Sequence, residues 1–231
     1  MNDQNIQMLR KAVLALGELA EDLVFVGGCT TTLFVTDPAA TEVRATKDVD
    51  AIVNATNYVE YLGFSDRLRS RGFEPDTRPD APLCRWIKYD ILVDVMPLDE
   101  SILGFSNVWY RDAIRSAETR YLYRDQTIRV VTPPYFLATK LEAFRSRGAA
   151  DFLASHDLED VLTVIDGRIE IVEEMKCASE DVRAFISQMI KGFLETPDFL
   201  DALPGHLLPD AASQARLPIL LLRLRELAAL S

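Results

Sequence analysis

Two short apolar segments bordered by polar residues place the strongest limits on what this chain can fold into. Residues 23–26 (LVFV) end directly in Gly27 and Gly28, and Asp48-Val49-Asp50 opens a second apolar run. Runs this short, rich in β-branched residues and next to glycine, are typical of buried strands. Residues two apart in a strand face the same side, so the side chains of Asp48 and Asp50 project together. The fold must therefore accommodate two like charges side by side.

Periodicity predicts an α/β front half and a helical back half. Apolar spacing predicts helices over residues 4–21 and 58–72, while RWIKYDILVDVMPL reads as two strands folded at Tyr89-Asp90. RYLYRDQTIRVV predicts a hairpin around residues 124–126, and Pro133-Pro134 precedes a helical pattern that continues to residue 231. We therefore expect an α/β (α+β) fold, with a mixed β-sheet core and flanking helices over residues 1–132 and a helical region over residues 133–231.

Composition limits the cellular location and the binding partners that we expect for the protein. Hydrophobic residues make up 48% of the 231 positions, enough for a sizeable core, yet no apolar run approaches the roughly 18 residues of a membrane span. The N-terminus does not resemble a secretory signal, and the three cysteines are widely spaced, so we expect no membrane partner and a reducing, cytoplasmic location. A net charge of −11 disfavours nonspecific binding of nucleic acid, which requires Lys and Arg to release counterions from the phosphates.

A third carboxylate, Asp94, stands in the apolar run LVDVM. A buried ionised carboxylate costs several kcal/mol unless it is paired or binds a metal. Three carboxylates that converge, Asp48, Asp50 and Asp94, predict a site for a hard divalent cation such as Mg²⁺. The competing explanation is structural: the first two would be turn or capping residues, and Arg85 would neutralise Asp94.

Two other metal-binding patterns do not fit. An EF-hand loop counted from Asp48 needs a glycine at its sixth position and a glutamate at its twelfth, where this chain has Val53 and Val59. A phosphatase of the haloacid dehalogenase type would place its apolar strand before the D-x-D pair, whereas here the strand follows it.

Gly27 and Gly28 fit a phosphate site beside the carboxylates. Without Cβ atoms they allow a triphosphate to approach the backbone, and a helix that starts nearby, with Thr30 as its N-cap, would direct its N–H groups at the phosphates. The pair alone is weak evidence, because it also suits a tight turn. Neither the Walker pattern nor the dinucleotide pattern G-x-G-x-x-G is present.

The ordered set of these residues resembles the polymerase-β nucleotidyltransferase superfamily. The elements are a strand, Gly27-Gly28, then Arg44-x-Thr46-x-Asp48-x-Asp50, and later Asp94 within VDV. With ATKLEAF and HDLEDV further on, the chain is similar to AbiEii/AbiGii-type nucleotidyltransferases, many of which are toxins of toxin–antitoxin or phage-defence systems. The resemblance covers about residues 20–165. It departs from the family in the 19 residues between Gly28 and Asp48, which imply an inserted loop around TDPAATEV.

The resemblance implies roles for individual residues. Gly27, Gly28 and Thr30 would bind the nucleotide phosphates, and Asp48, Asp50 and Asp94 would bind one or two Mg²⁺ ions and act in catalysis. Lys140 would contact phosphate and serve catalysis, while Asp157 and Asp160 match a D-x-x-D segment, the first with a catalytic role and the second with a binding role. Structural roles remain open for these three: Lys140 borders an apolar helix face, and an acidic residue near a helix start stabilises the helix dipole.

These roles imply transfer of a nucleoside monophosphate from a nucleoside triphosphate to a hydroxyl acceptor. The motif order favours RNA, such as a tRNA 3′ end, or a protein as the acceptor, with the chain acting as a toxin that has a cognate antitoxin. The acidity of the chain instead favours a small cationic acceptor of the aminoglycoside type. The third alternative is a non-catalytic binding partner that retains the fold.

Overall fold

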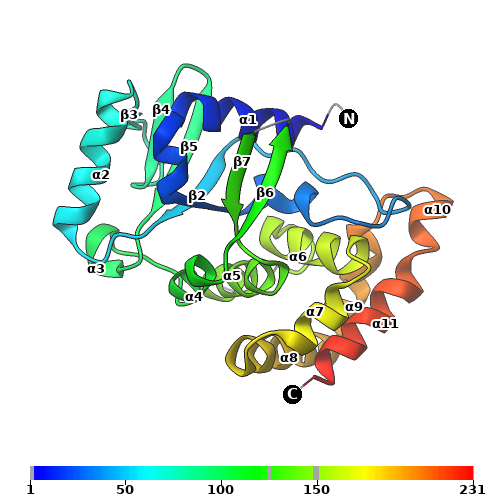
Figure 1. The fold of residues 1–231 in the computed structure, drawn as a ribbon. Coiled ribbons are helices and arrows are strands. Elements are labelled where there is room, and N and C mark those ends of the chain that lie inside the picture. The colour runs from blue at the N-terminus through cyan, green and yellow to red at the C-terminus, as the bar shows by residue number, and fades with distance from the viewer. Residues whose placement is uncertain (1–2, 124–125, 148–150, 231) are drawn as a thin grey trace. The chain divides into compact units, whose positions relative to one another are not determined.

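A computed structural model describes residues 3–123, 126–147 and 151–230 (Figure 1). The chain divides into two compact units. The first consists of Met1–Thr32 and Arg44–Thr132, and the second of Leu33–Val43 and Pro133–Ser231. The segment Leu33–Val43, which lies in the sequence between the Gly27-Gly28 turn and Asp48, therefore belongs to the second unit.

The first unit holds all seven strands and four α-helices among its described residues. In chain order they are α1 (Gln4–Leu16), β1 (Leu23–Val26), β2 (Val49–Val53), α2 (Tyr58–Ser70), β3 (Glu74–Pro75), β4 (Arg85–Lys88), β5 (Ile91–Met96), α3 (Glu100–Leu103), α4 (Tyr110–Arg115), β6 (Glu118–Tyr123) and β7 (Gln126–Val130). Two 3₁₀-helices, Gly17–Asp22 and Gly28–Leu33, flank β1.

The strands form one sheet in the order β3-β4-β5-β2-β1-β7-β6. Two neighbouring pairs, β1 with β7 and β2 with β5, are parallel, and the other pairs are antiparallel. All four residues of β1 are buried, which explains why LVFV is apolar without alternation. Helix α1 contacts β2, β5 and β6 (Figure 1). The predicted mixed α/β fold is confirmed.

Local structure differs from the sequence-based expectation at two places. The first helix ends at Leu16, because Gly17 adopts a positive φ of 60° and the chain continues as a 3₁₀-helix. Thr30 lies inside the 3₁₀-helix Gly28–Leu33, so its expected position as the N-cap is wrong. The predicted hairpin forms between β6 and β7, although residues 124 and 125 of its turn lie outside the described residues.

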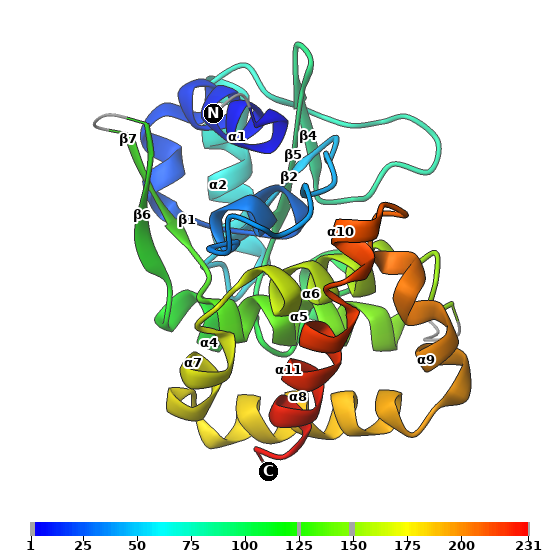
Figure 2. The ribbon, with the colours of Figure 1, turned by 90° about the vertical axis from the view of Figure 1, so that its right-hand side faces the viewer.

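The second unit is helical (Figure 2). Its helices are α5 (Pro133–Ser146), α6 (His156–Gly167), α7 (Ile171–Cys177), α8 (Glu180–Leu194), α9 (Pro197–Ala202), α10 (Ala211–Gln214) and α11 (Leu217–Ala228), with a 3₁₀-turn at Leu203–His206. Helices α6 and α8 each pack against both α5 and α11. No helix within the described ranges is long and apolar enough to cross a membrane.

Polar contacts attach the segment Leu33–Val43 to these helices. The backbone N–H groups of Thr36 and Asp37 both donate to the carbonyl of Gly167, each over 2.9 Å. Arg216 binds Asp37 and Asp166 through its guanidinium group, at 2.8 and 2.7 Å. Arginine and aspartate are rarely buried unless paired, so this ion-paired cluster fixes the segment in the helical unit.

Candidate functional site

The strand pairing places two of the predicted metal ligands, Asp50 and Asp94, in one row across the sheet with Arg85. Asp50 on β2 is the register partner of Asp94 on the parallel strand β5, and Asp94 is the register partner of Arg85 on the antiparallel strand β4. Directly paired residues on neighbouring strands project from the same face. Asp48 lies in the bend just before β2, and its carboxylate contacts the same arginine. The strands thus bring two of the predicted carboxylates to one face, and the arginine connects the third with one of them.

Arg85 forms ion pairs with two of these carboxylates. Its Nε lies 2.7 Å from Oδ1 of Asp94 and its Nη2 lies 2.8 Å from Oδ2 of the same residue. The same Nη2 also donates to Oδ2 of Asp48. The side chain of Asp94 is 7% exposed and that of Arg85 is 17% exposed. Arg85 therefore provides the pairing that a buried Asp94 requires.

Burial and the ion pair with Arg85 have opposite effects on the pKa of Asp94. Burial raises the pKa of the Asp94 carboxyl, while the hydrogen bonds and charge of Arg85 lower it. The hydrogen bonds to Asp94 also raise the pKa of Arg85, so that guanidinium stays charged at any physiological pH. The cluster therefore contains one permanent cation beside its three carboxylates.

Gly27 lies against the carboxylate of Asp50. A Cβ built on Gly27 would lie 1.9 Å from Oδ2 and 2.7 Å from Cγ of Asp50, and the φ of Gly27 is 78°. Only glycine meets both conditions without strain, because any side chain would occupy the space of the carboxylate. The glycine that the sequence assigned to phosphate binding thus also makes room for Asp50.

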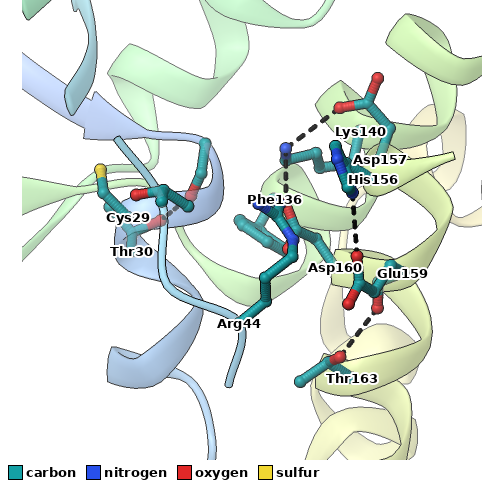
Figure 3. Close-up of polar contacts among 12 residues, drawn as sticks. Cys29, Thr30, Arg44, Phe136, Lys140, His156, Asp157, Glu159, Asp160 and Thr163 are labelled. Atoms are coloured by element: carbon teal, nitrogen blue, oxygen red, sulfur yellow. Dashed lines mark hydrogen bonds and ion pairs between the residues drawn. The ribbon is translucent and has the colours of Figure 1, made fainter. Parts of the chain in front are cut away.

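Thr30 is held within the turn after β1. Its hydroxyl donates to the carbonyl of Gly27 over 2.8 Å and its N–H donates to the same oxygen over 3.0 Å (Figure 3). Thr30 is fully buried. Its hydroxyl proton is therefore engaged inside the protein, and the predicted role of Thr30 and Gly28 in binding phosphate stays a prediction.

Asn5 of α1 fixes the segment that leads into the aspartate pair. Its Nδ2 donates to the carbonyl of Arg44 over 2.9 Å, and its Oδ1 accepts the N–H of Thr46 over 2.9 Å. One amide side chain thus satisfies a donor and an acceptor of the backbone, as a neighbouring strand would. Asn5 is only 2% exposed, and it positions the backbone two residues before Asp48.

The three carboxylates are suitable ligands for a divalent cation, but two of them, Asp48 and Asp94, are paired with Arg85. Carboxylate oxygens are the ligands that Mg²⁺ prefers, and the free space beside Gly27 lets Asp50 approach the turn. Within residues 3–123, 126–147 and 151–230, no three His, Cys, Asp or Glu side chains are grouped as ready metal ligands. Asp48, Asp50 and Asp94 could hold the ion if the Arg85 guanidinium moved away from Asp48 and Asp94.

The second unit contains a separate charged cluster around Lys140. Nζ of Lys140 lies 3.0 Å from Oδ1 of Asp157 and 2.7 Å from Oδ2 of Asp160 (Figure 3). Arg147 lies 2.5 Å from the other oxygen of Asp157. The two aspartates are three apart on α6, which places them on the same helix face. Lys140 is thus neutralised by the D-x-x-D pair, with its side chain 12% exposed.

The structure thus brings the predicted residues together in two groups. Gly27, Asp48, Asp50 and Asp94 meet in the first unit, and Lys140, Asp157 and Asp160 meet in the second. The expected functions of the second group stay predictions.

Two residues that contact the carboxylates or the segment before them, Arg85 and Asn5, were not among the predicted site residues. Arg85 entered only as a structural explanation for Asp94, although folding the hairpin at Tyr89-Asp90 pairs the two directly. Asn5 had a signal as well, since it shares the buried stripe of α1 with Leu9 and Leu16. A polar residue on such a stripe must find a partner inside the protein.

Comparison with known proteins shows a likeness of fold. No family model matches the chain, and no curated protein matches it. An antigenic nucleotidyltransferase-like protein from Paracoccidioides brasiliensis superposes with a TM-score of 0.50 at 18% identity, covering 88% of this chain and 94% of that one. JHP933 from Helicobacter pylori also has a TM-score of 0.50, at 13% identity, covering 99% of this chain and 93% of that one. The chain therefore has the fold of nucleotidyltransferase-like proteins.

Proposed function

We propose that this chain is a metal-dependent nucleotidyltransferase that moves a nucleoside monophosphate from a nucleoside triphosphate to a hydroxyl acceptor. The observation that carries the proposal is the register of β2 with β5, which sets Asp50 beside Asp94 at the turn formed by Gly27. The fold likeness to nucleotidyltransferase-like proteins supports the same class of enzyme.

In this proposal each residue has a limited task. A bound Mg²⁺ would supply charge stabilisation for the phosphates and the attacking oxygen. Asp48, Asp50 and Asp94 would hold it, and Asp94 would also help to accept the proton of the acceptor hydroxyl. Gly27 makes room for the Asp50 carboxylate and would meet the phosphates through its backbone, and Asn5 holds the segment before Asp48 in place. Positioning of the reactants then supplies most of the rate enhancement.

We further propose that the acceptor is RNA, such as a tRNA 3′ end, or a protein, and that the chain acts as a toxin with a cognate antitoxin. The order of motifs that resembles the AbiEii/AbiGii type supports this reading. The net charge of −11 favours a second candidate, transfer to a small cationic molecule of the aminoglycoside type. Incubation of total RNA, of a protein extract and of an aminoglycoside with each α-labelled nucleoside triphosphate separates these acceptors by which one becomes labelled.

Replacement of the aspartate pair tests the chemistry. We expect Asp48→Ala with Asp50→Ala to abolish labelling of the acceptor while the circular dichroism spectrum stays that of the native fold. Asp90→Ala is the matched control, because Asp90 is an exposed aspartate of the β4–β5 turn, 74% accessible and bound to Lys11. Undiminished transfer by the double variant would refute the proposed function.

A further inference from the structure

Arg85 takes the contacts that a metal ion would need. Both oxygens of Asp94 accept hydrogen bonds from Arg85, and the nitrogen that binds Oδ2 of Asp94 also binds Asp48. A fork of two charged N–H groups on one carboxylate gives hydrogen bonds about twice as strong as those between neutral groups. The guanidinium therefore bridges two of the three predicted metal ligands.

The bridge offsets a charge that the fold itself creates. The register of the sheet holds Asp50 beside Asp94, and the carboxylate of Asp48 lies against the arginine that binds Asp94. Like charges brought together in a partly buried site destabilise the folded state unless a cation lies among them. Arg85 is the register partner of Asp94, so the strand pairing that creates the problem also supplies the cation.

A divalent cation and this guanidinium cannot both bind Asp48 and Asp94 in the observed way. The guanidinium lies between the two carboxylates, and its charge would repel a metal ion placed within contact of the same oxygens. Binding of the ion must therefore be accompanied by withdrawal of Arg85. The side chain is 17% exposed, so one side of it has access to solvent.

We propose that Arg85 is an internal cation that holds the carboxylate site together without metal and competes with a divalent cation for Asp48 and Asp94. This inference rests on the metal site of the proposed function. It adds that the affinity for metal is set by the strength of the arginine bridge. The chain then keeps its fold when metal is absent and binds metal weakly until Arg85 withdraws.

The test is binding of Mn²⁺ alone, without nucleotide, measured by isothermal titration calorimetry and by thermal unfolding. Arg85→Met removes the charge and keeps an apolar stem. In EDTA we expect this variant to have a lower melting temperature than the wild type. Addition of Mn²⁺ should raise its melting temperature by more than it raises that of the wild type. Its dissociation constant for Mn²⁺ should fall by about tenfold or more, which corresponds to about 1.4 kcal/mol.

Arg115→Met is the control. Arg115 also pairs with one aspartate of the first unit, Asp112, over 3.0 Å, but this pair is exposed and its carboxylate is not a predicted ligand. The control should bind Mn²⁺ as the wild type does. Arg85→Lys keeps the charge but loses the fork, so its affinity should lie between those of the wild type and Arg85→Met, and it serves in place of Arg85→Met if that variant does not fold.

The outcomes separate this inference from the proposed function. If Arg85→Met and Arg85→Lys bind Mn²⁺ no more tightly than the wild type, competition by Arg85 is refuted while the metal site stands. If none of these proteins binds Mn²⁺, the metal site of the proposed function fails together with the inference.

Discussion

The Cβ position of Gly27 coincides with the carboxylate of Asp50: a methyl group there would lie 1.9 Å from Oδ2. Gly27 follows β1 directly, and Asp50 is paired with the last residue of that strand, Val26. The turn and the aspartate are therefore fixed relative to each other by sheet register, and a change at either residue should affect both.

Gly27→Ala should lower both stability and nucleotidyl transfer. The positive φ alone costs about 1 kcal/mol or more for alanine, and displacing Asp50 adds about 1–3 kcal/mol of overpacking. Gly104→Ala is the control for the first cost, because Gly104 has a φ of 80° but open space around its Cβ position. Urea unfolding measures the difference between the two variants. Equal losses of stability would show that the contact with Asp50 is unimportant.

Asn5→Ala should weaken the attachment of the segment before Asp48. The substitution leaves the carbonyl of Arg44 and the N–H of Thr46 without their amide partner, at a cost of about 1–3 kcal/mol. Transfer should fall as well, because Asp48 is then less well positioned. Gln4→Ala is the control, since Gln4 is an exposed residue of the same helix. Hydrogen exchange at the Thr46 amide should increase in the Asn5 variant alone, and unchanged protection there would contradict this role.

Lys140→Met should destabilise the helical unit. It leaves Asp157 and Asp160 buried with one partner fewer, and breaking a buried ion pair from one side costs about 3–5 kcal/mol. Combining it with Asp160→Asn should restore part of the loss, because the second change removes one of the unpaired charges. Lys191→Met on α8, where the lysine is exposed, should have little effect. If Lys140→Met melts like the wild type, the lysine serves a ligand rather than the fold.

Asp37→Asn should change how stability depends on pH. The N–H of Ala39 and the guanidinium of Arg216 lower the pKa of Asp37 in the folded chain. A lowered folded pKa stabilises the protein above the unfolded pKa, about 4, and this stabilisation is lost as the pH falls through the folded value. The wild type should therefore exceed the variant in unfolding free energy at pH 7, and the difference should shrink below pH 4. Exposed Asp201 of α9, changed to Asn, is the control; a constant difference across this range would contradict the linkage.

Some features of the site follow from local pattern. Alternation and apolar runs place β1, β2, β4 and β5 within a residue or two, because buried strands need apolar side chains whatever their neighbours are. Folding at Tyr89-Asp90 then sets Arg85 against Asp94 by counting along two strands. The period of two residues likewise predicts Asp48 and Asp50 on one face, although Asp48 lies in the bend just before β2.

Other features needed the tertiary structure, because they join residues that are far apart in the chain. Nothing in the residues around Asp50 states that β2 runs parallel to β5, or that Asn5 reaches Arg44 and Thr46. The sequence predicts the inserted segment only as a loop, and its contacts with Gly167 and Arg216 assign it to the helical unit.

The sequence by itself thus determined the type of fold, the strands and the residues that carry the carboxylates and the glycine turn. The tertiary structure alone decided that Asp50 lies beside Asp94 and that Asp48 shares the arginine that binds Asp94. The physical reason is that strand propensity and side-chain direction are set within a few residues, whereas the free energy of a buried charge depends on which distant groups the sheet brings beside it. In this chain the pairing of β2 with β5 brings Asp48 and Asp50 beside Asp94, and Arg85 pairs with Asp48 and Asp94.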